Sequence, residues 1–256
     1  MSTLQMLSPS AATDAAWLAA ADVAAIATDL DFRYRLVGGI SITLLAHHYG
    51  VEDVVPARET ADADMGVPRD VCADERLLIA LEDRQYKREG GNRFVRQDGD
   101  RELVIDVLAP APGRDLEANH EIGSLSVDLI PGLLQAFLLP AVEVKMVAHL
   151  TDGTELPMTV ALSDPRGALI LKAFAYAGRF TDRDALDVWR LLEVTYKAGL
   201  TAADWPDRPI ALEAAHLLHR SFAAPPAMGA TRATPRPAEQ ARMRLLVQTI
   251  VPKPVV

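Results

Sequence analysis

The pattern of apolar residues changes once along this chain, near Leu162. Before Leu162, short apolar runs alternate like strands, and two of the turns that join them carry Asp-Gly, at Asp98-Gly99 and Asp152-Gly153. An Asp-Gly pair between two apolar runs is a strong signal of a β-hairpin. After Leu162, apolar residues recur at helical spacing. We therefore expect an α+β fold in which a mixed sheet with flanking helices is followed by a C-terminal helical domain.

The same pattern predicts three parts. Residues 1–162 form an α/β domain that opens with a helix over residues 10–30, and residues 163–222 form the helical domain. The last part, 223–256, contains Pro225, Pro226, Pro235 and Pro237. It also holds five basic residues against Glu239 alone. We expect it to be a Pro-rich linker followed by a basic C-terminal tail.

Charge and cysteine content narrow the classes of function. The net charge is −9, which argues against broad attraction to nucleic acid or to anionic membranes, so an RNA partner needs a local basic patch. Cys72 is the only cysteine, which excludes an internal disulfide and a cysteine-rich zinc site. The sequence shows neither a signal peptide nor a long apolar run, so we expect a cytoplasmic protein without a membrane segment.

Three aspartates form the first candidate site. Asp62 and Asp64 are two apart in an alternating segment, 60–67, so on a strand they share one face. Carboxylates held this close repel each other, and a divalent cation such as Mg²⁺ or Mn²⁺ removes that cost. Asp106 lies inside an apolar strand segment, where a carboxylate is expensive to bury unless it is paired or binds a metal. A solvated strand face is the alternative interpretation of Asp62 and Asp64.

A glycine pair forms the second candidate site. Gly38 and Gly39 stand between a predicted strand, 32–37, and a predicted helix, 40–49. Without side chains at the turn, backbone N–H groups and the helix N-terminus can approach a phosphate. The glycines could equally make a tight turn and nothing more.

A lysine and two aspartates in the helical half form the third candidate site. Lys172 is the only charged residue between Ala168 and Gly178, so it must reach solvent, pair with an acid, or face a cleft that holds anions. Asp184 and Asp187 follow on the next predicted helix, three apart and on one face. Their alternative role is to stabilise the N-terminus of that helix.

Taken in order, these segments resemble the nucleotidyltransferase fold of the polymerase-beta type. The resemblance rests on Leu36-Val37-Gly38-Gly39, on the segment 58–64 with its Asp-x-Asp, and on Val104-Ile105-Asp106-Val107. The helical half, with Lys172, Arg179 and Arg183-Asp184-Ala185-Leu186-Asp187, is similar to the AbiEii-type subfamily, which includes bacterial abortive-infection toxins.

The resemblance implies a metal-dependent, pyrophosphate-releasing transfer of a nucleoside monophosphate from an NTP to an acceptor hydroxyl. Asp62, Asp64 and Asp106 would hold Mg²⁺ or Mn²⁺, and Lys172 would neutralise the triphosphate. Nucleotide binding would involve Gly38, Gly39, Ser41, Lys172, Asp184 and Asp187. Many members of this family have serine where Gly39 stands here, so the nearest hydroxyl groups are those of Ser41 and Thr43.

The resemblance to AbiEii-like proteins implies a toxin that modifies RNA, with tRNA as the best-known acceptor. It also implies an antitoxin, encoded by a neighbouring gene, that holds the toxin in check. On this chain RNA would approach along the basic tail or a cleft lined by Arg88, Arg93 and Arg96. Two alternatives stay open, a small-molecule nucleotidyltransferase and a catalytically inactive binding protein of the same fold.

Overall fold

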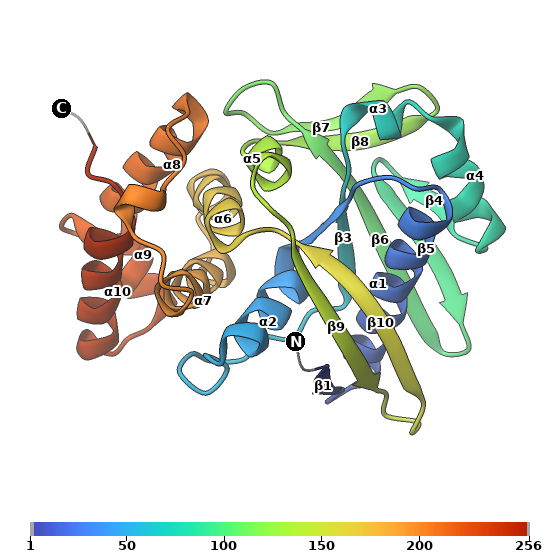
Figure 1. Ribbon diagram of the computed structural model, residues 1–256, viewed down its shortest axis with the longest axis horizontal. Coiled ribbons are helices and arrows are strands. Elements are labelled where there is room, and N and C mark those ends of the chain that lie inside the picture. Colours follow the sequence, from blue (N-terminus) through green and yellow to red (C-terminus); the bar gives the residue numbers. More distant parts are fainter. Residues whose placement is uncertain (1–2, 255–256) are drawn as a thin grey trace. The chain divides into compact units, whose positions relative to one another are not determined.

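The computed structural model describes residues 3–254 (Figure 1). Its strands are β1 (Leu4–Leu7), β2 (Arg35–Val37), β3 (Asp62–Gly66), β4 (Lys87–Gly90), β5 (Arg93–Asp98), β6 (Arg101–Pro110), β7 (Glu117–Ile122), β8 (Leu125–Ile130), β9 (Val142–His149) and β10 (Glu155–Leu162). The α-helices are α1 (Ala11–Asp29), α2 (Gly38–Tyr49), α3 (Arg69–Cys72), α4 (Glu75–Asp83), α5 (Leu133–Leu138), α6 (Pro165–Arg179), α7 (Asp182–Lys197), α8 (Pro209–Leu218), α9 (Met228–Ala233) and α10 (Pro237–Ile250). Short 3₁₀ and π turns, η1 (Ala202–Asp204) and η2 (His219–Ala223), complete the set.

The described chain divides into two compact units. Unit 1 comprises residues up to Leu44 together with Arg58–Ser163 and contains all ten strands. Unit 2 comprises Leu45–Ala57 and the residues from Asp164 onward and is helical. Helix α2 begins in unit 1 and its last turn belongs to unit 2. The predicted α+β fold, a mixed sheet followed by helices, is confirmed.

Unit 1 is built on one mixed sheet in the order β1-β9-β10-β2-β3-β6-β5-β4, and β8 pairs with the end of β6 and with β7. The two predicted hairpins are present, because β5 pairs with β6 and β9 pairs with β10 in antiparallel fashion. At the centre β3 lies parallel to β6 and antiparallel to β2. This places the strand that precedes the glycine pair beside the strand that carries Asp62 and Asp64.

The two faces of this sheet differ in chemistry. Paired residues on neighbouring strands project to the same face, and successive residues along a strand alternate. One face presents fully buried side chains on β3, β5 and β6, namely Ala63, Met65, Phe94, Leu103, Ile105 and Val107. Helix α1 packs against β3, β6 and β10 on this face and supplies Trp17, Val23 and Ile26 to the core (Figure 1). The opposite face carries Asp62, Asp64 and Asp106.

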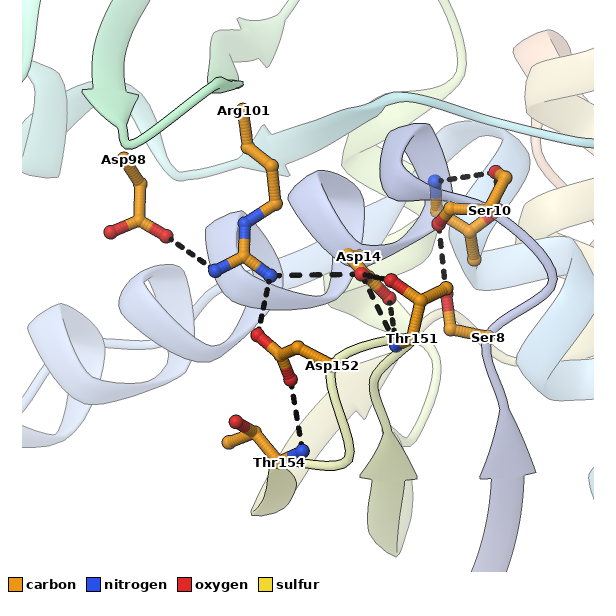
Figure 2. A network of polar contacts seen from close by, with 9 residues as sticks. Ser8, Ser10, Asp14, Asp98, Arg101, Thr151, Asp152 and Thr154 are labelled. Atoms are coloured by element: carbon orange, nitrogen blue, oxygen red, sulfur yellow. Dashed lines mark hydrogen bonds and ion pairs between the residues drawn. The ribbon is translucent and has the colours of Figure 1, made fainter.

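Helix α1 begins where the sequence predicts, because Ser10 caps it by accepting a hydrogen bond from the Thr13 N–H. One turn further on, the carboxylate of Asp14 is fully buried. It accepts hydrogen bonds from the backbone N–H of Thr151 at 3.1 Å and the Thr151 hydroxyl at 2.5 Å, and Arg101 lies 3.6 Å away (Figure 2). Burial by itself would raise the pKa of Asp14, but the Ser8 hydroxyl, the two Thr151 donors and Arg101 together hold that pKa below its ordinary value. The network ties α1 to the β9–β10 turn and to the start of β6.

Unit 2 buries apolar side chains of α6, α7, α8 and α10, among them Leu169, Leu191, Leu218 and Val247. Thr181 caps α7 by accepting from the Asp184 N–H, and Pro165 and Pro209 stand in the first turns of α6 and α8. Helix α6 continues through Gly178. It ends at Arg179, because Phe180 adopts a left-handed conformation and closes the helix.

The predicted linker and basic tail are replaced by folded helices. Helices α9 and α10 lie within residues 223–254, and Met243, Leu246 and Ile250 of α10 are buried. Arg232 pairs with Asp182 at 2.6 Å and Arg242 pairs with Glu193 at 2.9 Å, both within unit 2. The prolines misled the prediction because Pro237 occupies the first turn of α10, where proline is well tolerated.

Among residues 3–254, no helix is long and apolar enough to cross a membrane.

We expect Asp14→Ala to destabilise unit 1 by about 3 kcal/mol, because it leaves Arg101 and the Thr151 donors without their buried acceptor. Asp98→Ala removes another carboxylate partner of Arg101, but that one is 41% exposed, so its cost should stay below about 1 kcal/mol. Urea unfolding of both variants measures the difference.

The destabilisation caused by Asp14→Ala should be smaller in acid than at neutral pH. Because folding lowers the pKa of Asp14, its contribution is present above the ordinary value of 3.8 and is lost as pH falls below it. A difference between Asp14→Ala and the parent that is as large in acid as at neutral pH would contradict this assignment.

Candidate functional site

The turn from β2 into α2 has no connecting residues, because β2 ends at Val37 and α2 begins at Gly38. Gly38 takes a φ of +70°, a backbone conformation that residues with a side chain rarely adopt. A Cβ at Gly38 would stand 1.6 Å from the Oδ2 atom of Asp64. The Asp64 carboxylate therefore occupies the space that the missing side chain leaves, directly against the first residue of α2. The glycine turn and the Asp-x-Asp strand form one site.

A second contact at this turn involves Arg58, to which sequence analysis assigned no role. A Cβ at Gly39 would stand 2.4 Å from a guanidinium nitrogen of Arg58 and 2.9 Å from the hydroxyl oxygen of Thr60. The second glycine thus leaves space that the ends of the Arg58 and Thr60 side chains occupy. A helix N-terminus flanked by an arginine is a favourable environment for an anion.

Ser41 lies in the first turns of the same helix and is 1% exposed. Its Oγ atom has no hydrogen-bond partner among the residues that the structure describes. A buried hydroxyl without a partner costs free energy, which a ligand oxygen can recover. Ser41 is therefore the hydroxyl near the glycine pair that has unused hydrogen-bonding capacity.

The sheet register brings the three aspartates together. Asp62 and Asp64 lie two apart on β3, and Asp64 is the register partner of Asp106 on the parallel strand β6. All three therefore project from the same face, opposite the apolar face covered by α1. Asp106 is buried at 8% exposure, and Asp62 accepts a hydrogen bond from the Thr60 hydroxyl at 3.0 Å.

Asp106 is engaged by an arginine from the next strand. Arg93 on β5 is its antiparallel register partner and donates from Nε to Oδ1 at 2.9 Å and from Nη2 to Oδ2 at 2.8 Å. This is a two-bond fork that uses both carboxylate oxygens. The hydrogen bonds to Asp106, with a further electrostatic contribution from Asp62, raise the pKa of Arg93. Arg93 is thus the cation that balances this acidic face.

Oxygen donors on one face suit a hard divalent cation such as Mg²⁺ or Mn²⁺, and Asp62 and Asp64 fit this role in kind. Within residues 3–254, however, no group of three or more His, Cys, Asp or Glu side chains is arranged to hold a metal ion. The contact that stands against a three-aspartate site is the Arg93 fork, which takes both oxygens of Asp106. Arg93 would have to leave Asp106 before Asp106 could become a ligand.

Unit 2 holds the third predicted group as a network of its own. The Nζ atom of Lys172 on α6 lies 2.8 Å from Asp187 and 3.4 Å from Asp184, both on α7 and both fully buried. Arg179 forms a second fork on Asp184, with distances of 2.9 and 2.6 Å. Burial would raise the pKa of Asp184, but Arg179 and Lys172 outweigh it and lower this pKa to about 2. Of the three options left open for Lys172, pairing with acids is the one observed. The role of this group toward a nucleotide stays a prediction.

The predicted RNA cleft does not form. Arg93 and Arg96 lie on opposite faces of β5, because Arg93 pairs in register with Asp106 and Arg96 with the core residue Leu103. Arg96 forms an ion pair with Asp22 of α1 at 3.1 Å, and Arg88 donates to the Ser124 carbonyl at 2.5 Å. Residues three apart on a strand face opposite ways, so the three arginines cannot line one surface.

Comparison with known proteins gives limited similarity. No family model and no curated protein matches this chain. A solution structure of the antibiotic-resistance factor ANT(2'')-Ia has a TM-score of 0.37 and 13% identity, over 91% of this chain and 90% of its own. A crystal structure of ANT(2'')-Ia in complex with adenylyl-2''-tobramycin has a TM-score of 0.30 and 15% identity, over 88% and 94%. At these TM-scores the similarity establishes neither a family nor an activity for this chain.

We expect Gly38→Ala to destabilise unit 1 by about 3 kcal/mol, because the new Cβ strains the backbone and displaces the Asp64 carboxylate. Gly99→Ala is the matched control, since Gly99 has a similar φ of +65° but nothing within 4 Å of its Cβ position. It should cost only about 1 kcal/mol. Equal losses in urea unfolding would show that the carboxylate does not depend on the glycine.

Lys172→Met should destabilise unit 2 by about 3 kcal/mol or more, because Asp187 loses its buried cation. Lys197→Met, at an exposed lysine of α7, serves as the control and should change stability little. In the parent, the contribution of Asp184 is present above its ordinary value of 3.8 and is lost as pH falls to about 2. In Lys172→Met that loss should begin at higher pH, which urea unfolding at several pH values can measure.

Proposed function

We propose that this chain is a divalent-cation-dependent nucleotidyltransferase that moves a nucleoside monophosphate from an NTP to an acceptor hydroxyl. The observation that carries the proposal is the contact between Gly38 and Asp64. It joins a helix N-terminus, which suits a phosphate, to a carboxylate face, which suits a hard cation. A triphosphate with its cation needs both features at one place.

The start of α2 would bind the triphosphate. Gly38 and Gly39 let phosphate oxygens approach the backbone, and the positive end of the helix favours their charge. The unpartnered Oγ of Ser41 can donate to a phosphate oxygen, and Arg58 beside Gly39 adds a cation. These four residues come from α2 and from the segment just before β3, so one local unit supplies the phosphate contacts.

Asp62 and Asp64 would hold the cation, and Asp106 could join them if Arg93 were released. A bound cation would supply charge stabilisation at the oxygens that enter and leave the α-phosphorus. Asp106, as the third carboxylate of the face, is the group that can orient the attacking hydroxyl and accept its proton. Its neighbours on the same face of β6, Val104 and Leu108, are buried.

A small hydroxyl compound is the acceptor that we propose. RNA binding needs several cations on one surface, and Arg93 and Arg96, which were predicted for this role, lie on opposite faces of β5. Arg232, Arg236 and Arg242 each pair with a carboxylate at 2.6 to 2.9 Å. The RNA or tRNA acceptor and the antitoxin partner implied by the AbiEii resemblance stay predictions.

A nucleotide-binding protein without transferase activity is the second candidate. It is favoured by the Arg93 fork on Asp106, which occupies the carboxylate that catalysis would use. This candidate predicts nucleotide binding with no transfer, so one pair of assays separates the two.

The first test is thermal unfolding with each of four nucleoside triphosphates, with and without Mg²⁺. We expect one triphosphate to stabilise the parent only when Mg²⁺ is present, by about 2.7 kcal/mol at 100 times its dissociation constant. Asp62→Asn/Asp64→Asn should lose this stabilisation. Asp100→Asn/Asp115→Asn, which removes two exposed carboxylates of unit 1, should keep it.

The second test follows the α-phosphate label of that triphosphate into small hydroxyl compounds and into total RNA. Transfer with release of pyrophosphate supports the enzyme, and stabilisation without transfer supports the binding protein. Transfer to RNA that falls steeply between about 50 and 200 mM salt would overturn the small-molecule acceptor. Absence of stabilisation by all four triphosphates would overturn both candidates.

A further inference from the structure

We propose that Arg93 is an exchangeable counter-ion that holds Asp106 before ligands bind, yields it to a divalent cation, and then binds a phosphate of the triphosphate. The inference rests on the proposed function and assigns a positioning role to a residue outside the motifs that suggested that function. Arg93 is the antiparallel register partner of Asp106.

Arg93 and a divalent cation need the same atoms of Asp106. Arg93 donates to both oxygens of Asp106, at 2.9 and 2.8 Å, and a cation bound there needs at least one of those oxygens. Arg93 and the cation therefore bind Asp106 in competition. Electrostatic contact of Arg93 with Asp62 extends the competition to the neighbouring carboxylate.

The two partners differ in exposure. The side chain of Arg93 is 44% exposed, whereas that of Asp106 is 12% exposed. A half-exposed arginine can rotate into solvent at low cost, because water replaces its hydrogen bonds. Asp106 is held in the middle of β6, so the arginine is the partner that moves.

A bound triphosphate would give the released Arg93 guanidinium a new partner. A triphosphate at the start of α2, beside Asp64, lies next to the strand that carries Asp106. The planar fork of arginine matches two phosphate oxygens as well as it matches a carboxylate. Exchange of Asp106 for phosphate keeps every charge paired in both states.

The exchange predicts opposite effects on two ligands, which a purely structural cross-strand ion pair does not. Arg93→Gln should bind Mn²⁺ at least about tenfold more tightly, because the cation no longer competes with a charge-assisted fork. It should bind inorganic tripolyphosphate in the presence of Mg²⁺ at least about tenfold more weakly, because the phosphate loses its arginine. Arg93→Lys, which keeps the charge without the fork, should lie between the parent and Arg93→Gln for both ligands.

Free Mn²⁺ measured by electron paramagnetic resonance gives the first affinity, and isothermal titration calorimetry gives the second. The control is Arg96→Gln, on the same strand, which removes an arginine paired with Asp22 on the opposite face. It should leave both affinities unchanged. In Arg93→Gln/Asp106→Asn the gain in Mn²⁺ affinity should disappear, which assigns the gain to Asp106. If Arg93→Gln fails to fold, the intermediate values of Arg93→Lys carry the test.

The outcomes separate this inference from the function on which it rests. Equal Mn²⁺ affinity in the parent and Arg93→Gln, with loss in Asp62→Asn/Asp64→Asn, overturns the exchange and leaves the metal site standing. Unchanged tripolyphosphate affinity in Arg93→Gln also overturns the exchange. No Mn²⁺ binding by any of these proteins overturns the proposed function and the exchange with it.

Discussion

The parallel pairing of β3 with β6 is the constraint on which the rest of unit 1 depends. Along β3, the apolar residues Ala63 and Met65 alternate with Asp62 and Asp64, and apolar residues alternate along β6 in step with them. Only in this register can α1 cover one face of the sheet with apolar contacts. A slip of one residue would turn the aspartates into the core and the apolar side chains into water. The hydrophobic effect on one face thereby aligns the carboxylates on the other.

Charged groups are stabilised in two different ways in this protein. Asp14 in unit 1 is fully buried and meets Thr151 and Arg101 (Figure 2). Asp187 in unit 2 is fully buried and meets Lys172. Loss of such a partner leaves a charge in a low dielectric, so these networks hold structure. Arg93 is half-exposed instead, and its pairing with Asp106 can be exchanged at low cost. The cations that meet Asp14 and Asp187 are 19% and 11% exposed, whereas Arg93 is 44% exposed.

Sequence analysis succeeded where the cause of structure is local. Asp-Gly turns predicted both hairpins, and apolar residues at helical spacing predicted the first helix over residues 10–30, which is α1. It failed where packing decides, as at residues 223–238, whose prolines suggested a linker although this segment contains α9 and the start of α10. The predicted cleft of Arg88, Arg93 and Arg96 was wrong, because side chains alternate along β5 and Arg93 and Arg96 therefore face opposite ways.

The sequence by itself determined which residue types could form a site: a glycine pair between strand and helix, two aspartates that share a strand face, and a third within an apolar strand. Only the tertiary structure decided that Asp64 fills the space at Gly38, that Asp106 is its register partner, and that Arg93 holds Asp106. The physical reason is that alternation and capping depend on neighbours in the chain. Strand order and register instead depend on burying one common face against α1, which joins segments far apart in sequence.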